Sequence, residues 1–270
     1  MTAFVHSISF ELQNGLRNKS LLLMNYLFPL GFYFMVGSVM ASINPFFTEI
    51  MVPAMVIFTV LSGTVISLPN PLVEAREAGI LRSYRINGVP SLSVLAIPSL
   101  TAGVHLFLVS IIITVTAPVL FDAPQPVNLS AFALCYLVTL FACSGLGQLI
   151  GVISANTQVS VLWSQLVYLP SMLIGGLMIP ADVLPAGLQK VSQLLPTTHA
   201  MQAFNSLAMG SETAVSPWWA LLVLFVGGIV AYALAGLLFS WDNKNPGRGR
   251  YPLLAVLALL PYVFAAVLLP

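Results

Sequence analysis

The sequence predicts an all-α protein, a polytopic bundle of membrane-spanning helices. The first reason is composition, since 59% of the 270 residues are apolar and only 6% are charged, whereas a soluble domain carries roughly 25% charged residues. The second reason is that seven long apolar stretches contain no Asp, Glu, Lys or Arg. A soluble fold could not cover its surface with so few charges, so we expect an integral protein of the lipid bilayer. The net charge of +1 provides no basic surface for a nucleic acid.

A spanning helix needs about 20 mostly apolar residues. Six stretches fit this length and are predicted as the core spans: 21–43, 51–70, 92–120, 129–153, 158–180 and 217–240. A seventh apolar segment at 252–269 is shorter, and we predict a C-terminal spanning helix there. Pro252 and Pro261 leave a kinked or re-entrant course open for this segment.

The cationic residues predict the orientation. If the N-terminus is cytoplasmic, eight of the nine Lys and Arg residues fall on the cytoplasmic side, and only Lys190 falls outside. The positive-inside rule favours this orientation over its reverse. A seventh span would then put Pro270 outside.

Near the N-terminus, one segment has an amphipathic helical pattern instead of a spanning one. Five apolar residues fall within about 120° of a helical wheel: Phe4, Val5, Ile8, Leu12 and Leu16. This pattern is typical of an interfacial helix that lies along the inner membrane face.

The loop that follows the fifth span, residues 181–216, predicts a structured outer helical cap. Asp182 and Pro185 are suitable start signals for a first helix that Pro196 would end. Its predicted apolar face contains Leu184, Leu188, Val191 and Leu195. A second helix would put Met201, Phe204 and Ala208 on one side and stop at Gly210. The alternative is a solvated linker, which would lack such periodic apolar residues.

The stretch EAREAGILRSYRINGVPS, residues 74–91, holds five of the seventeen charged residues. Asn70 and Pro71 are suitable start residues for a short cytoplasmic helix, and Asn87-Gly88 are suitable end residues. Gly79 within this helix would lower the stability of the helix by about 1 kcal/mol relative to Ala. The close approach of another backbone would explain why glycine is present despite this cost. We interpret the stretch as a docking helix for a soluble partner. The alternative is a solvated loop whose arginines only set the topology.

Two motifs carry a resemblance to a known family. The first is the charged loop, with Glu74, Arg76, Glu77, Gly79, Leu81 and Pro90 in the pattern Glu-Arg-x-x-Gly, Leu, then Pro. Ala75 separates Glu74 from Arg76. The second motif follows the fifth span and contains Pro180, Leu184, Pro185, Leu188, Pro196, Thr198, Phe204 and Gly210. The two motifs occur in this order and on opposite sides of the predicted membrane. Together they resemble the motifs of the permease subunits of type-2 ABC exporters, a family that includes drug- and polysaccharide-export permeases.

The resemblance covers residues 1–242 and implies a transmembrane domain of that family in a prokaryotic inner membrane. It implies a dimer of permease chains, here expected as a homodimer, above two copies of an ABC ATP-binding subunit that holds the ATP and Mg. The implied ATPase-coupling helix contains Glu74, Arg76, Glu77, Gly79, Leu81, Arg82 and Arg85. The implied outer gate contains Leu184, Leu188, Val191 and Phe204. The apolar segment 252–269 departs from the family pattern.

Family analogy also selects the first, second and fifth spans for a substrate pathway. The polar and aromatic candidates there are Asn25, Tyr26, Phe32, Tyr33, Thr59, Ser62, Trp163, Gln165 and Tyr168. Ordinary packing and hydrogen bonding between helices is the alternative role for each of them. Because the spans carry no Asp, Glu, Lys or Arg, we expect an amphipathic or apolar cargo such as a drug, a lipid-like molecule or a glycolipid.

The chain has no phosphate-binding loop motif, because no Gly-Lys pair occurs in it. No nucleophile with a base, no paired acids and no metal-ligand spacing is visible, so we expect neither an enzyme nor a metal or cofactor site. His105 is the ionisable residue within the spans, with a packing role or a proton or substrate role open to it. The rival functions are a non-transporting membrane scaffold and a secondary transporter that uses His105.

Overall fold

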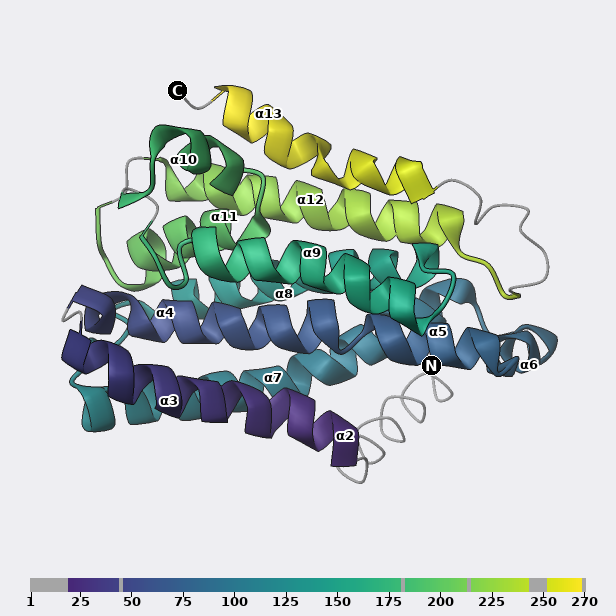
Figure 1. The fold of residues 1–270 in the computed structure, drawn as a ribbon, viewed down its shortest axis with the longest axis horizontal. Coiled ribbons are helices and arrows are strands. Elements are labelled where there is room, and N and C mark those ends of the chain that lie inside the picture. Colours follow the sequence, from purple (N-terminus) through teal and green to yellow (C-terminus); the bar gives the residue numbers. More distant parts are fainter. Residues whose placement is uncertain (1–18, 44–45, 181–182, 213–214, 243–251, 269–270) are drawn as a thin grey trace.

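The computed structural model describes residues 19–43, 46–180, 183–212, 215–242 and 252–268. Within these ranges the chain forms helices and connecting loops, with no strand. The helices lie lengthwise in one bundle (Figure 1). The predicted interfacial helix at Phe4–Leu16, the start residue Asp182 and the terminal Pro270 lie outside the described residues.

The first two spans each contain a π-helical turn. In the first, α2 (Lys19–Leu22) continues through the π-helical η1 (Leu23–Leu27) into α3 (Phe28–Ile43). In the second, α4 (Phe46–Leu61) and the π-helical η2 (Ser62–Ile66) lead into α5 (Pro69–Glu77). Such π-helical turns are frequent at functional sites.

The remaining elements follow in the order that the hydropathy pattern predicts. They are α6 (Ile80–Ile86), α7 (Ser91–Phe121), α8 (Leu129–Ile153), α9 (Thr157–Ile174), α10 (Ala186–Ser192), α11 (Pro196–Ala203), the π-helical η4 (Phe204–Ala208), α12 (Pro217–Leu238), the 3₁₀-helical η5 (Pro252–Leu259) and α13 (Leu260–Leu268). The short helices α10 and α11 confirm that the loop after the fifth predicted span is a helical cap.

Five helices of the described chain are long and apolar enough to cross a membrane. They are Leu23–Met40, Phe47–Glu77, Ser91–Phe121, Leu129–Ile153 and Pro217–Leu238, and they correspond to the predicted spans one to four and six. The predicted fifth span, 158–180, contains the 18-residue α9, which is not among them. Helix α9 ends at Ile174, and Gly176 in the following loop has a φ of 87°.

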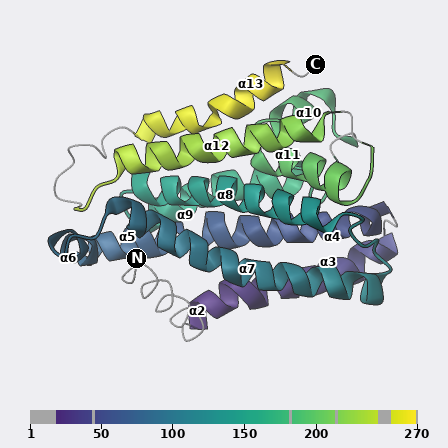
Figure 2. The same ribbon diagram turned by 180° about the vertical axis from the view of Figure 1, so that it is seen from behind.

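The predicted seventh span is an apolar helical segment, Leu253–Val267, that is shorter than the five spanning helices. It begins as a 3₁₀-helix, which rises about 2.0 Å per residue instead of 1.5 Å. Elements η5 and α13 together therefore extend roughly 30 Å, comparable to the hydrocarbon core of a bilayer. They pack along α12, and α13 runs back toward α10 (Figures 1 and 2).

Small residues let the spans approach closely within this chain. A Cβ atom on Gly147 of α8 would lie 2.3 Å from the Thr64 carbonyl oxygen, and one on Gly151 would lie 3.1 Å from the Pro69 oxygen. This GxxxG pair therefore seats α8 against η2 and α5. On α12, a Cβ on Gly227 would lie 2.4 Å from the hydroxyl oxygen of Tyr262. Gly227 thus makes room for the buried Tyr262 ring of α13.

The two ends of the bundle are formed by different short helices. Helix α6 and the end of α5 lie at one end, and α10 and α11 lie at the other (Figures 1 and 2). We refer to them as the α6 end and the α10 end. The predicted docking loop and the predicted outer cap therefore lie on opposite sides of the bundle.

Candidate functional site

The charged loop at the α6 end is not one capped helix. Helix α5 begins at Pro69, Leu68 before it has a helical backbone, and no side chain caps this start. The Leu68 N–H donates to the Thr64 carbonyl 3.3 Å away. The predicted start at Asn70-Pro71 is therefore wrong, because the second span continues without a break into α5 and ends only at Glu77.

Gly79 divides the charged loop into α5 and α6. Its φ of 76° is left-handed, a conformation that glycine adopts without the penalty of a Cβ. Close approach of another backbone of this chain does not explain the glycine, because a Cβ there would meet no described residue within 4 Å. The predicted end of the loop helix is confirmed: α6 stops at Asn87, and Gly88 has a φ of 74°.

Two residues anchor the charged loop to the bundle. Arg76 is buried, and its guanidinium donates to the carbonyl oxygens of Val152, at 3.0 Å, and of Ser154. These carbonyls end α8, where a helix dipole favours a cation. Leu81 is 1% exposed and packs into the core cluster at this end. Arg76 and Leu81 therefore hold the loop in place and are not available on its surface.

A mixed apolar and charged surface remains on the loop. From the predicted coupling set, Glu74, Glu77, Gly79, Arg82 and Arg85 are exposed. Arg82 forms an ion pair with Asp242, beyond the end of α12. Sequence reasoning missed the exposed apolar members Ile80, Tyr84 and Ile86, of which Ile86 is 79% exposed. We call Glu77, Ile80, Tyr84, Arg85 and Ile86 the docking surface.

At the α10 end, the predicted outer gate separates into buried and exposed residues. Leu184 and Phe204 are buried, and the Phe204 ring lies 5.2 Å from that of Phe132. Leu188 and Val191 are 42% and 46% exposed, so the described chain does not cover this part of the predicted apolar face of α10.

Hydrogen bonds, instead of those two apolar residues, attach the end of α10 to α11. The Thr198 hydroxyl donates to the Ser192 carbonyl at 2.6 Å, and His199 Nε2 lies 2.9 Å from the Gln193 carbonyl. Burial lowers the pKa of His199, and the hydrogen bond to Gln193 partly opposes this effect. The neutral imidazole therefore donates its Nε2–H to that carbonyl.

The predicted pathway residues lie in different surroundings. Phe32 stacks on Phe58 with ring centroids 4.1 Å apart, and the Tyr168 ring centroid lies 6.2 Å from that of Phe58. This aromatic cluster joins the first span, the second span and α9. Trp163 is 38% exposed on α9, and Gln165 is half-buried there.

Four hydroxyl groups of the pathway set, those of Tyr26, Tyr33, Thr59 and Ser62, have hydrogen-bond partners. The Thr59 hydroxyl donates to the Met55 carbonyl at 2.8 Å, and the Ser62 hydroxyl donates to the Thr59 carbonyl at 3.1 Å. Both bonds lie within the second span. The Tyr33 hydroxyl lies 2.9 Å from that of Thr116. The ordinary packing role describes these three residues. Tyr26 is different, because its hydroxyl lies 2.7 Å from Nδ1 of His105 and so links the first span to α7.

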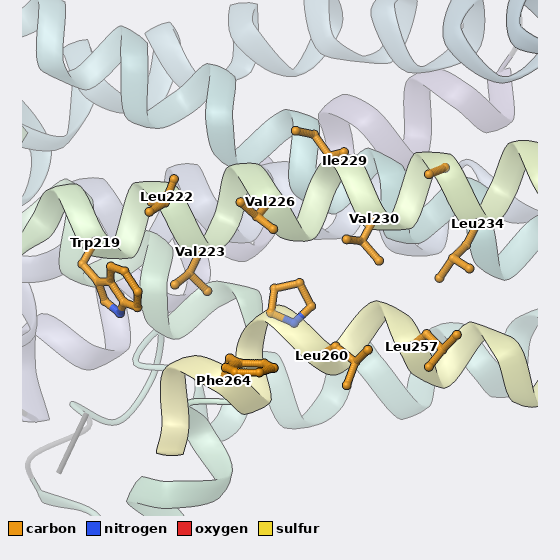
Figure 3. A pocket seen from close by; sticks show the side chains of 12 residues that line it. Trp219, Leu222, Val223, Val226, Ile229, Val230, Leu234, Leu257, Leu260 and Phe264 are labelled. Atoms are coloured by element: carbon orange, nitrogen blue, oxygen red, sulfur yellow. The ribbon is translucent and has the colours of Figure 1, made fainter. Parts of the chain in front are cut away.

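Two hollows differ in chemistry. A groove of ≈ 560 Å³ lies between α12 and the C-terminal segment, and apolar side chains line it (Figure 3). A cavity of ≈ 520 Å³ lies at the α6 end, and its lining includes the buried side chains of Asn25, Thr101, His105 and Gln148. Asn25 is the pathway candidate that lines this cavity.

Comparison with known proteins matches residues 2–209 to the family described as ABC-2 type transporter. A curated relative, "Putative transport permease YvfS" of Bacillus subtilis (strain 168), is 25% identical over 235 residues, which cover 85% of this chain and 92% of that protein. No solved structure matches this chain.

Proposed function

Because this chain belongs to the ABC-2 type transporter family, and is thus a multi-pass permease subunit of a transporter, we propose that it works as an ATP-driven exporter. Two identical permease chains form the pathway, and two separate ABC ATP-binding subunits dock beneath them. ATP and Mg bind to those subunits, so the permease itself carries no catalytic site. The cargo is amphipathic or apolar, in keeping with the seven apolar stretches of the sequence, which carry no Asp, Glu, Lys or Arg.

The docking surface is the observation that carries this proposal. It combines exposed aliphatic and aromatic groups, Ile80, Tyr84 and Ile86, with the charges of Glu77 and Arg85. Exposed apolar residues beside charged ones are typical of protein interfaces. The loop is also anchored, through Arg76 and Leu81, to α8 and the core cluster behind it. Force applied at this surface would reach the spans without first ordering a flexible segment.

We assign the α6 end to the cytoplasm and the α10 end to the outside of a prokaryotic inner membrane. The positive-inside rule supports the assignment, because Arg76, Arg82 and Arg85 lie at the α6 end and Lys190 lies on α10. In this orientation the docking surface faces the compartment that contains ATP. The exposed Leu188 and Val191 of α10 are then available to the second permease chain at the outer gate.

A pull-down with a co-expressed ABC ATP-binding subunit tests the proposal. The Ile80→Ala/Ile86→Ala variant should bind that subunit at least tenfold more weakly, since two interface truncations of about 1 kcal/mol each give this factor. Glu77→Arg should also weaken it by reversing a charge at the contact. The matched control is Leu188→Ala/Val191→Ala, an exposed apolar pair at the α10 end, which should bind normally.

The rival functions give different results in the same system. If the docking-surface variants bind the ATP-binding subunit as well as the unmodified chain, the docking proposal is wrong. A scaffold would bind the subunit without stimulating ATP hydrolysis or transport. A secondary transporter would follow a proton gradient without ATP, and a His105→Gln change would then abolish transport.

A further inference from the structure

The cavity at the α6 end lies within one subunit. Its walls come from the start of the first span, from η2, α5 and α6, from the first half of α7 and from one residue of α8, Gln148. In Figure 1, α5 and α6 lie at this end of the bundle. None of the lining residues belongs to α9 or to the elements after it. The cavity is therefore distinct from the apolar groove of Figure 3 and from the aromatic cluster that involves Tyr168.

Among the described residues, four buried polar atoms of the cavity's lining residues have no hydrogen-bond partner. They are Asn25 Oδ1, Thr101 Oγ1, His105 Nε2 and Gln148 Oε1. All four side chains are at least nine-tenths buried, with 4%, 7%, 5% and 1% exposed. Buried polar groups in proteins are nearly always hydrogen-bonded, so a group of orphaned atoms around one cavity requires an explanation.

Two of these side chains are held in place by their other polar atom. Gln148 Nε2 donates to the Ser99 hydroxyl at 3.1 Å, and His105 Nδ1 lies 2.7 Å from the Tyr26 hydroxyl. Each side chain thus has one polar atom in a hydrogen bond, while its second polar atom has no partner among the described residues. This arrangement is typical of a preformed polar recognition site, in which a few fixed groups orient a ligand.

The donor and acceptor types define the chemistry of the ligand. The amide oxygens of Asn25 and Gln148 only accept hydrogen bonds, so they require a ligand that donates. The Thr101 hydroxyl can donate or accept, and so can His105 according to its tautomer. The lining contains no Asp, Glu, Lys or Arg among the described residues. A charged headgroup would be buried there without a counter-charge, which is strongly unfavourable.

The other part of the lining is apolar. Leu68, Leu72, Leu81, Val94 and Ile97 line the same cavity, which suits a hydrocarbon chain. We propose that this cavity binds an amphipathic molecule with a neutral headgroup that carries hydroxyl or amide N–H donors, with its apolar tail against the leucine and valine wall. Bilayer lipid and export cargo are two sources of this one chemistry.

The site shares elements with the docking surface. Ala75 of α5 and Leu81 and Tyr84 of α6 line the cavity, and Tyr84 also belongs to the docking surface. Asn25 and Gly63 come from the π-helical turns η1 and η2. Occupancy would therefore bias the helices that contact the ATP-binding subunit. This coupling rests on the proposed function, whereas binding of the ligand does not.

Photolabelling of the full chain in lipid nanodiscs tests the binding. The probe is a monoacylglycerol with a photoreactive chain, and its two counterparts carry the same chain on a carboxylate or on a trimethylammonium group. The neutral probe should label wall peptides within 21–25 and 93–105, saturably and several-fold more strongly than either charged probe.

Matched isosteric variants separate recognition from folding. Thr101→Val removes a hydroxyl from the wall, and labelling should fall roughly three- to tenfold, the factor for one hydrogen bond. Gln148→Leu should act in the same way. Thr139→Val is the control, because Thr139 is also buried on a spanning helix with an orphaned hydroxyl but does not line the cavity. Its labelling should match that of the unmodified chain.

Several outcomes would overturn the proposal. One is labelling that does not saturate or does not depend on the headgroup, and another is an equal loss in Thr101→Val and Thr139→Val. Absence of labelling would mean that the cavity holds water only. If the neutral probe also stimulates ATP hydrolysis by the complex and is exported, the molecule that binds in the cavity is cargo. If the probe labels the cavity without stimulating hydrolysis, the bound molecule is a lipid, and the proposed binding site is still supported. Failure of the ATP-binding subunit to bind would contradict the proposed function and leave the labelling result unchanged.

Discussion

Arg76 shows how a single residue of the charged loop differs from its neighbours. Its neighbours in sequence, Glu74 and Glu77, are exposed, whereas Arg76 itself is 6% exposed and its guanidinium binds the carbonyl end of α8. Arg82, six positions later, is paired with Asp242 at the surface. Two arginines of one motif therefore have different roles, one in anchoring the loop and one at its edge.

Replacing Arg76 should destabilise the protein more than replacing Arg82. Arg76→Met leaves the Val152 and Ser154 carbonyls without this donor, which should cost about 1–3 kcal/mol. Arg82→Met removes the same formal charge from an exposed pair and should cost at most about 1 kcal/mol. Thermal unfolding in detergent, followed by tryptophan fluorescence, measures the difference. Equal losses in the two variants would show that the anchor contributes nothing beyond surface charge.

His199 should make the stability of the outer cap depend on pH. Its pKa in the folded protein is lowered by burial, while in the unfolded chain it is near 6.5. Below that value the unfolded state takes up a proton that the folded state resists, so stability should be full above about pH 6.5 and fall as the pH is lowered. Comparing the unfolding temperature at pH 7.5 and pH 5 in the unmodified chain and in His199→Gln checks this. A drop of the same size in both would assign the effect to other groups.

At the scale of elements, turns and π-helical segments set the geometry of the loop. The left-handed Gly79 separates α5, which continues the second span, from α6, which carries most of the docking surface. The π-helical turns η1 and η2 contribute Asn25 and Gly63 to the cavity behind it. The direction of α6 relative to the spans therefore depends on one backbone conformation.

Replacing Gly79 tests that dependence. Gly79→Val should strain the turn, because a left-handed backbone costs an ordinary residue about 1–2 kcal/mol and is worst for β-branched ones. Gly79→Asn should be tolerated, since Asn adopts this conformation most readily after Gly. The expected result is weak recovery of the ATP-binding subunit with Val and near-normal recovery with Asn.

The matched control for the turn is Gly187→Val in α10. A Cβ at Gly187 also meets open space, but its φ lies outside the left-handed region. Recovery of the ATP-binding subunit should be normal in this variant. If Gly79→Val also recovers the subunit normally, the angle between α5 and α6 does not matter for docking.

At the scale of the whole molecule, the fold separates two polar ends across an apolar bundle. The five spanning helices connect the α6 end to the α10 end, and η5 with α13 returns along α12 toward the α10 end (Figure 2). The family match ends at residue 209, before α12. The buried Tyr262 of α13 nevertheless packs against Gly227 of α12 and, with ring centroids 5.8 Å apart, beside His199 of α11. The C-terminal segment is therefore integrated into the bundle.

Cysteine labelling with a membrane-impermeant reagent should report this arrangement. Cysteines at the exposed positions Ser83 on α6, Glu212 after η4 and Val267 on α13 are suitable sites. We expect Ser83→Cys to react only from the cytoplasm and the other two only from outside. The native Cys135 and Cys143 are buried and should stay unlabelled. Reaction of Ser83→Cys and Glu212→Cys from the same side would contradict the topology, and cytoplasmic labelling of Val267→Cys alone would mean that the C-terminal segment does not cross.

The sequence by itself determined the membrane class, the positions of five spanning helices, the helical cap and the end of the charged loop at Asn87-Gly88. These features depend on hydropathy and on turn chemistry within a few residues, so they can be predicted without knowing which elements meet. Only the tertiary structure decided that Arg76 is buried, that Gly79 is a left-handed turn, that Leu188 and Val191 face outward, and that Asn25, Thr101, His105 and Gln148 line one cavity. Most of those properties depend on contacts between residues far apart in the chain, such as Tyr26 with His105 or Arg76 with Ser154. The periodicity of one helix does not show which neighbouring helix will cover each of its faces.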